Sequence, residues 1–290
     1  MAPHAEDTNG DSQPVNNGEA PLEPGVKKNV AAQGMLNFPR PPKFDDKYKE
    51  RDYLKGRLAA AFRLFGKYGF DEGVAGHITL RDPVQPDCFW VNPFGTAFSM
   101  INKSDLILVN HSGEVIDGGE NRLLNQAAYM IHSQVHAARP DVVCAAHSHS
   151  IYGRTWCSLG RKIDTLTQDA CAFHNDHVVY DSFNGVVLAE TEGKAIAECL
   201  GGKKAALLQN HGLLTVGHTT IMWFVSLEKC CHSQLMAEAA AASRGEKPII
   251  IGDEEATYTA RTVGSHRAGW FGAKPMFDTI HKETGGDYLQ

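Results

Sequence analysis

The spacing of its short apolar segments constrains the fold of this chain more than any other feature. Three such segments follow one another at residues 76–80, 88–92 and 106–110. Several of the connections hold too few residues for a helical crossover, and Ser112-Gly113 separates the third segment from residues 114–116 as a hairpin turn would. Because short connections join antiparallel strands, this half of the chain predicts an antiparallel sheet.

Helices are expected before and after these strands. Leu54, Leu58 and Phe62 recur at four-residue steps and predict one apolar helix face. That helix is expected over residues 46–68, with Gly69 as its stop. Further helices are expected at 124–138, at 191–200 and from near residue 220 to Gly245, and strands at 141–146, 205–208 and 213–216. The pattern predicts an α/β fold with a mixed, largely antiparallel sheet covered by helices.

The chain divides into three parts. Residues 1–37 contain no aromatic residue and are rich in Asn, Gly, Pro, Glu and Asp, so we expect a disordered tail that buries little apolar surface. Residues 38–245 are expected to form one domain, long enough for a large core. Residues 246–290 are aromatic yet loosely patterned, and we expect this arm to pack on the domain or on a neighbouring subunit.

The composition argues against several classes of protein. The net charge is −6, from 28 basic and 34 acidic residues, whereas nucleic-acid binders carry a basic excess. The 7 cysteines are odd in number and contain no Cys-x-x-Cys pair, which argues against a disulfide framework and a thiolate zinc module. No apolar segment reaches the roughly 18 residues of a membrane span. We therefore expect a cytoplasmic protein that binds no nucleic acid and does not span a membrane.

Three of the 14 histidines fall at expected strand ends. His147 and His149 follow the strand at 141–146, and residues two apart in an extended chain point to the same side, so both can reach one metal ion. His211 follows the next such strand, and Gly212 permits a sharp turn there. Three histidines with an open fourth position are typical of catalytic zinc and of non-haem iron. We interpret the three as metal ligands; the alternative is ordinary polar residues at a strand edge and in a turn.

Two glycine-containing turns are candidates for substrate binding. Gly76 and His77 form one of them, and Asn92 and Gly95 belong to the other. Backbone N–H groups in such turns bind carboxylate or phosphate groups, although a purely structural role is the alternative.

His132 and His136 lie four residues apart on one face of a predicted helix. No glutamate accompanies them in a His-Glu-x-x-His pattern, so an orienting or packing role is expected rather than metal binding.

These motifs, in this order, resemble the class II aldolase and adducin head-domain family. The matching segments, within residues 57–242, are Gly76-His77-Ile78-Thr79, Asn92-Pro93-Phe94-Gly95, Ile131-His132, Ala138-Arg139-Pro140-Asp141, His147-Ser148-His149 and Asn210-His211-Gly212. The resemblance implies a three-layer α/β/α sandwich, a small-molecule substrate and a homo-oligomer, with a tetramer favoured.

The resemblance also implies a chemistry. In the aldolase members the three matching histidines hold Zn²⁺ or another divalent ion, which stabilises the enediolate formed when a carbon–carbon bond breaks. This implies a divalent-metal-dependent lyase for aldol cleavage or decarboxylation of a small hydroxy or keto acid or a sugar derivative. Zn²⁺ is the expected metal, with Fe²⁺ or Mn²⁺ as alternatives.

Two positions depart from the aldolase pattern. The aldolases carry a proton-transferring glutamate four residues before the histidine that matches His132, and Ala128 stands there instead. In this the chain is closer to the adducin-like branch, which lacks the glutamate. The aldolases also supply a tyrosine from a neighbouring subunit after the paired histidines. Here that region offers Asp169 and, second, His174, which we take as the candidate catalytic residues.

Three functions stay open at this point. Three intact ligands favour a lyase, with Phe94, Phe98 and Phe173 expected as its apolar lining. A non-haem iron oxygenase on the same histidines is the second, and bound iron with oxygen uptake distinguishes it. Ala128 favours the third, a non-catalytic scaffold or binding protein similar to adducin.

Overall fold

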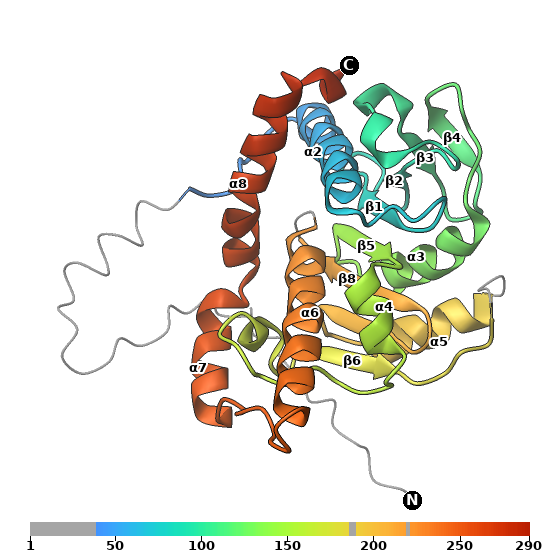
Figure 1. The fold of residues 1–290 in the computed structure, drawn as a ribbon. Helices are drawn as coiled ribbons and strands as arrows, with labels where there is room; N and C mark the ends of the chain where they lie inside the picture. The colour runs from blue at the N-terminus through green and yellow to red at the C-terminus, as the bar shows by residue number, and fades with distance from the viewer. Residues whose placement is uncertain (1–38, 186–189, 219–220) are drawn as a thin grey trace, which may run out of the picture.

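The computed structural model describes residues 39–185, 190–218 and 221–290, so the expected disordered tail at 1–37 lies outside the described residues. An 8-stranded sheet has the order β4-β3-β2-β1-β5-β8-β7-β6 (Figure 1). Its strands are β1 (His77–Arg81), β2 (Phe89–Val91), β3 (Ile107–Val109), β4 (Val115–Gly118), β5 (Cys144–Ser148), β6 (His177–Tyr180), β7 (Ala205–Leu208) and β8 (Gly212–Gly217).

Neighbouring strands are antiparallel except for β6 and β7, which are parallel. The hairpin expected around Ser112 and Gly113 joins β3 to β4. The mixed, largely antiparallel sheet is therefore confirmed.

Helices cover both faces of the sheet. They are α2 (Lys47–Tyr68), α3 (Gln126–Ala138), α4 (Ile151–Cys157), α5 (Glu190–Leu200), α6 (Met222–Ala242), α7 (Asp253–Val263) and α8 (His266–Thr284). α3 and α5 pack on one face, and α2, α4 and α6 pack on the other, which confirms the three-layer sandwich. No helix in the described part of the chain combines the length and the apolar character that crossing a bilayer requires.

α2 begins and ends where the sequence predicts. The side chain of Asp46 accepts hydrogen bonds from two backbone N–H groups of the first turn, and Gly69 closes the helix with a left-handed φ of 72°. Leu58 and Phe62 are fully buried against the sheet. The apolar face thus sets the helix on the sheet beside β1.

β5 lies at the centre of the sheet and begins later than the sequence predicts. The expected strand covered residues 141–146, whereas β5 covers Cys144–Ser148. The N–H of Val142 donates to the carbonyl of Arg139 and so continues the turn after α3. The shift brings His147 into the ladder itself, where its backbone is held by strands on both sides.

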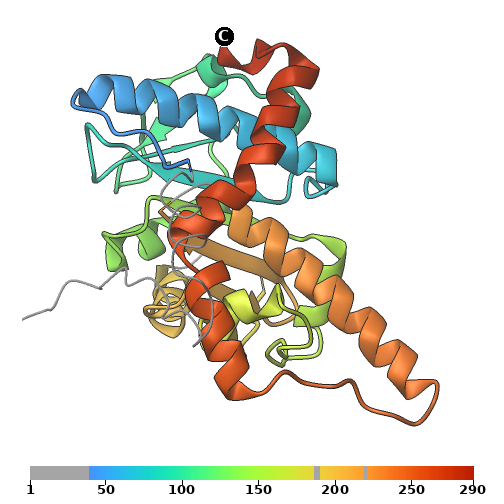
Figure 2. The ribbon, with the colours of Figure 1, turned by 90° about the vertical axis from the view of Figure 1, so that its left-hand side faces the viewer.

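The C-terminal arm is more regular than expected. It forms α7 and α8, and α8 crosses α2 and also packs against α6 (Figures 1 and 2). Phe277 of α8 is buried, and the guanidinium of Arg57 lies over its ring at 3.2 Å from the centroid. The arm therefore packs on its own domain through an apolar face.

Candidate metal centre

His147 lies in β5 opposite His77 of β1 and Leu214 of β8. Its Nδ1 lies 2.9 Å from the carbonyl oxygen of Leu213. Because a carbonyl oxygen only accepts, Nδ1 of the neutral ring carries the proton and Nε2 keeps its lone pair. The fold thus presets His147 for coordination through Nε2, and His149 follows two residues later at the strand end.

His211 comes from the tight connection between β7 and β8. Asn210 turns the chain with a left-handed φ of 56°. A Cβ atom on Gly212, two residues after Asn210, would lie 2.5 Å from the carbonyl oxygen of Ser148 and 3.4 Å from Cε1 of His147. Only glycine lets this turn approach the end of β5 so closely, and that approach brings His211 to the other two histidines.

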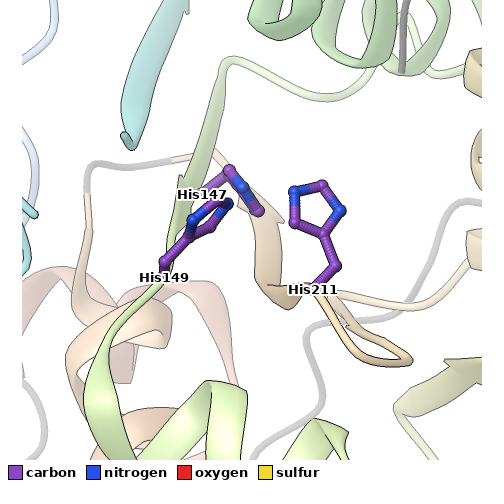
Figure 3. Close-up of side chains that lie close together, drawn as sticks. All are labelled: His147, His149 and His211. Carbon is purple, nitrogen blue, oxygen red and sulfur yellow. The ribbon is translucent and has the colours of Figure 1, made fainter. Parts of the chain in front are cut away.

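The three imidazoles gather at one point (Figure 3). Each offers a ring nitrogen, and these atoms lie within 4.8 Å of one another. The ring centroid of His147 lies 5.1 Å from that of His149 and 4.7 Å from that of His211. The ring centroids of His149 and His211 are 4.9 Å apart. We call His147, His149 and His211 the triad.

Burial keeps the triad neutral. Burial and the nearby His149 lower the pKa of His211 to about 4. Burial, followed by His211 and His77, lowers the pKa of His147 well below its ordinary value. The pKa of His149 is lowered by burial, with the Glu72 carboxylate acting in the opposite direction. Three neutral nitrogen donors, one with a fixed tautomer, fit a single divalent ion.

A buried carboxylate fixes the chain directly after His149. Glu228 of α6 accepts a hydrogen bond from Oγ of Ser150 at 2.5 Å and from the backbone N–H groups of Tyr152 and Gly153 at 3.1 and 2.8 Å. The two N–H groups belong to the first turn of α4, where they have no partner within the helix. Burial raises the pKa of Glu228, and the three hydrogen bonds favour its charged form. Glu228 escaped prediction because a single acid in an apolar helix carries no motif.

A second carboxylate lies near the triad. Glu72, in the connection between α2 and β1, accepts a hydrogen bond from Arg154 of α4. Its charge favours the protonated form of His149. Glu72 was also missed, since no local pattern distinguishes it from a surface acid.

The expected substrate-binding residues fall on two strands. The ring of His77 lies 5.1 Å from that of His147, and Gly76 approaches the same strand so closely that a Cβ would lie 3.3 Å from the carbonyl oxygen of His147. Asn92 is buried at the end of β2, the strand next to β1, and its Oδ1 has no partner in the described residues. Gly95 lies in an exposed turn with a φ of 86°, and no atom of the described residues lies within 4 Å of a Cβ position there. The structure brings Gly76 and His77 to the triad and leaves Asn92 and Gly95 one strand further away.

Ala128 lies on the same face of α3 as His132, one turn earlier, and is buried. The His132 ring contacts that of His77, with 4.1 Å between centroids. The helix wall next to His77 therefore carries a methyl group where a carboxylate would stand in the aldolase pattern.

Asp169 and His174 lie away from the triad of their own chain. They flank the short 3₁₀ turn η3 (Ala170–Phe173), which precedes β6. His177 pairs with Ala205 in the parallel β6–β7 ladder, so the residues before β6 lie where β7 begins, whereas the triad lies where β7 ends. The structure does not bring Asp169 or His174 to this triad, and a catalytic role for either is left to a second copy of the chain.

Two of the three phenylalanines expected to line the site belong to the core instead. Phe98 packs against Phe62, with 4.9 Å between ring centroids, and Phe173 packs against Trp223 at 6.1 Å. Both are buried because each lies in a 3₁₀ turn whose apolar side faces a helix. Phe94 is partly exposed in the turn after β2.

The chain was compared with known proteins. Residues 56–235 match the family described as Class II Aldolase and Adducin N-terminal domain. The chain is 46% identical over 246 residues to the decarboxylase NovR of Streptomyces niveus, covering 83% of this chain and 88% of that protein. It is also 46% identical over 246 residues to a protein of Streptomyces roseochromogenus subsp. oscitans named 4-hydroxy-3-prenylphenylpyruvate oxygenase/4-hydroxy-3-prenylbenzoate synthase, covering 83% and 86%. Among solved structures it is similar to an L-fuculose 1-phosphate aldolase from Glaciozyma antarctica PI12, with a TM-score of 0.79, 45% identity and coverage of 87% and 97%.

Proposed function

The chain belongs to the class II aldolase and adducin N-terminal domain family, and from this premise we propose that it is a divalent-metal-dependent lyase. Its reaction would break a carbon–carbon bond of a small keto or hydroxy acid, with release of CO₂ as the favoured case. The observation that carries the proposal is the triad of neutral imidazoles, with the lone pair of His147 Nε2 left free for coordination.

His147, His149 and His211 would hold the ion, with Zn²⁺ as the favoured metal and Fe²⁺ or Mn²⁺ as alternatives. When bound, such an ion supplies fixed positive charge next to the oxygen on which negative charge develops. His77 stands beside the ligand His147 and would orient the substrate. Glu228 holds the turn after His149 and so keeps that imidazole in place.

Ala128 favours decarboxylation over aldol cleavage. Aldol cleavage needs a base that takes the proton of the substrate hydroxyl, and a methyl group cannot do so. Loss of CO₂ from an acid whose carbonyl lies one carbon away needs no base, since the carboxylate is already ionised. The electrons of the broken bond pass to that carbonyl, and water returns a proton to carbon.

The choice of substrate makes the proposal testable. We would load the protein with Zn²⁺, Mn²⁺ or Fe²⁺ and measure CO₂ release from oxaloacetate under argon, subtracting the release by the free ion. Faster release by the loaded protein, and none beyond the free ion by a His147→Ala variant, is the expected result. No release above that of the free ion with any metal would overturn the proposal.

One relative supports a second candidate, an iron- and O₂-dependent oxygenase. The relative from Streptomyces roseochromogenus is named for both a phenylpyruvate and an oxygenase. In phenylpyruvate the carboxylate is attached to the carbonyl carbon, so loss of CO₂ alone has no neighbouring electron acceptor and O₂ must take the electrons. CO₂ release from phenylpyruvate only with Fe²⁺ and with stoichiometric O₂ uptake would favour this candidate.

A non-catalytic scaffold is the third candidate, and Ala128 is the residue that supports it. It predicts neither turnover nor a metal site open to substrate.

We also propose a cytoplasmic homo-oligomer, with a tetramer favoured. Large apolar side chains on the surface support an assembly: Ile249 is 90% exposed and Met236 62% exposed. A catalytic role for Asp169 or His174 would require such an assembly, because both lie away from their own triad. A monomeric mass by light scattering would contradict it.

A further inference from the structure

A chain of hydrogen bonds runs through the interior beside the triad. Arg81 of β1 lies with Nη2 3.3 Å from Nδ1 of His136. The hydroxyl of Thr79 lies 2.8 Å from Nε2 of His136 and 2.7 Å from Nδ1 of His132. Thr79 and both histidines are buried, and none of them is needed to hold a metal at the triad.

The hydrogen bonds from Arg81 to His132 all donate in the same direction. A guanidinium only donates, so Nδ1 of His136 accepts and its Nε2 carries the proton. Nε2 therefore donates to the hydroxyl of Thr79, which donates its own proton to Nδ1 of His132. The proton of the neutral His132 ring must then lie on Nε2. Arg81 is fixed at the start of this hydrogen-bond series, because Nη2 also lies 2.6 and 3.1 Å from the carbonyl oxygens of His136 and Arg139, so that one of its two N–H groups is shared between two of the three acceptors.

The His132 end of this series of hydrogen bonds lies beside ring nitrogens that have no partner in the described residues. Nε2 of His132 and both ring nitrogens of His77 are buried and make no hydrogen bond within the described residues. The two rings touch, and that of His77 also touches the ligand His147. Buried polar atoms are nearly always paired, so three unpaired nitrogens in one contact cluster indicate a polar guest at this place.

We infer that His132 and His77 form the anion-binding end of the substrate site, and that Thr79, His136 and Arg81 are positioning residues that hold His132 as a hydrogen-bond donor. The guest is the carboxylate of a small keto acid. This inference rests on the proposed function, since it takes the triad as the place where the substrate binds.

The surroundings favour a carboxylate over a phosphate. Nδ1 of His132 accepts from Thr79, so this ring has one proton, on Nε2, to offer a guest. One proton per ring suits a singly charged carboxylate, whereas a phosphate dianion is usually met by Arg or Lys. The guanidinium of Arg81 is turned to backbone carbonyls instead. Ala128 adds no negative charge to repel the guest.

Neutron diffraction tests the direction of these hydrogen bonds, and it needs neither substrate nor metal. Crystals exchanged into D₂O are expected to show deuterium on Nε2 of His136, on Oγ1 of Thr79 pointing to His132, and on Nε2 of His132. Deuterium on Nδ1 of His132 would overturn the inference, whatever the protein catalyses.

Binding of pyruvate tests whether the hydrogen bonds through Thr79 position His132 for the carboxylate. Thr79→Val keeps the shape of a strand residue and removes the hydroxyl, whereas Thr79→Ser keeps the hydroxyl and loses only a methyl group. With the metal-loaded protein, we expect the Kd for pyruvate to rise roughly 5- to 20-fold in Thr79→Val and to stay near the wild-type value in Thr79→Ser. Both variants are expected to keep the wild-type metal content, because Thr79 does not touch the triad.

The outcomes separate this inference from the proposed function. Metal binding and CO₂ release by the wild type, together with an unchanged Kd for pyruvate in Thr79→Val, would overturn the positioning role and leave the lyase proposal standing. Inorganic phosphate binding more tightly than pyruvate would overturn the carboxylate assignment. A wild type that binds no metal would remove the proposed function. If Thr79→Val fails to fold, the neutron result still decides the direction of the hydrogen bonds from Arg81 to His132.

Discussion

A Cβ atom on Gly212 would lie 2.5 Å from the carbonyl oxygen of Ser148, well inside van der Waals contact. The contact joins the first residue of β8 to the last residue of β5, and the triad residues stand directly beside it. Space for a side chain here can come only from separating the two strands, and separating them moves His211 away from its partners.

Gly212→Ala is therefore expected to weaken metal binding by at least roughly tenfold and to lower the free energy of unfolding by about 1–3 kcal/mol. Titration with a competing chelator measures the first and urea unfolding the second. Gly202→Ala is the matched control, since Gly202 lies in the exposed turn before β7, where no atom in the described part of the chain lies within 4 Å of a Cβ position. Equal metal affinity in the two variants would contradict the close-approach argument.

Removal of one triad ligand is expected to abolish stoichiometric metal binding. His147→Ala and His211→Ala each leave two ligands, which is too few for a stable zinc site. Elemental analysis after dialysis gives the metal content. His174→Ala, which removes a histidine at the other end of the sheet, is expected to keep it. Full metal content in both triad variants would mean that the triad is not the site.

Ala128→Glu restores the carboxylate of the aldolase pattern one turn before His132. Because that charge would face the anion-binding end of the site, we expect the Kd for pyruvate to rise more than roughly tenfold, as one repulsive contact costs more than 1.4 kcal/mol. Ala128→Gln has the same bulk without the charge. An equal loss in both variants would show that crowding, and not repulsion, is responsible.

The metal-free protein is expected to lose stability in acid through its buried histidines. The pKa of His136 is lowered to about 3, mainly by burial and then by Arg81, whereas an unfolded histidine titrates near 6.5. Between these values the unfolded chain binds one more proton than the folded chain at this residue. The contribution of neutral His136 to the free energy of unfolding is complete above pH 6.5. It falls by up to about 1.4 kcal/mol per pH unit as the pH drops from 6.5 toward about 3.

His136→Gln isolates this contribution, because its amide can still donate to Thr79 but does not titrate. Urea unfolding at pH 7 and pH 5 should show a smaller difference between the two pH values for the variant than for the wild type. An equal difference would mean that His136 is protonated in the folded protein at pH 5.

Asp169 can act at a triad only from another copy of the chain. Asp169→Asn, which leaves only water to return the proton to carbon, is then expected to be slowed by roughly 100-fold or more, and His147→Ala to be inactive. When the two variants are unfolded together and refolded as a mixture, some sites receive an intact triad from one copy and Asp169 from the other, and part of the activity should return. Full activity of Asp169→Asn alone, or no recovery in the mixture, would remove Asp169 from the mechanism.

The strand segments could be predicted because their side chains alternate between two buried faces. In β5, Cys144 and Ala146 pack on the α2 side of the sheet and Ala145 on the α3 side. The same alternation directs His147 toward α3, where His132 lies, and this is why a two-residue histidine spacing was a reliable signal.

α8 could not be predicted, because its local signals conflict. Pro275 and Gly269 both disfavour a helix, yet both lie inside α8. Gly269 packs so closely on Trp223 that a Cβ would lie 2.7 Å from its ring. Packing against α2 and α6, which the sequence does not reveal, decides in favour of the helix.

The same limit applies to the candidate site. The triad was found from local spacing, but the contacts of Glu228 with Gly153 and of Glu72 with Arg154 join residues far apart in the sequence. Thr79 stands out in the sequence only as part of a motif, because its role between His132 and His136 depends on how α3 packs on β1.

An ion held by the triad would also fasten the chain to itself. It would tie the end of β5 to the β7–β8 turn and close the whole segment from His149 to His211, as a reversible crosslink does. Its stabilisation grows with the concentration of free ion, by about 2.7 kcal/mol at a hundred times the Kd. The lifetime of this protein against proteolysis would then follow the supply of metal in its surroundings, so that a cell short of the ion would lose the polypeptide as well as its activity.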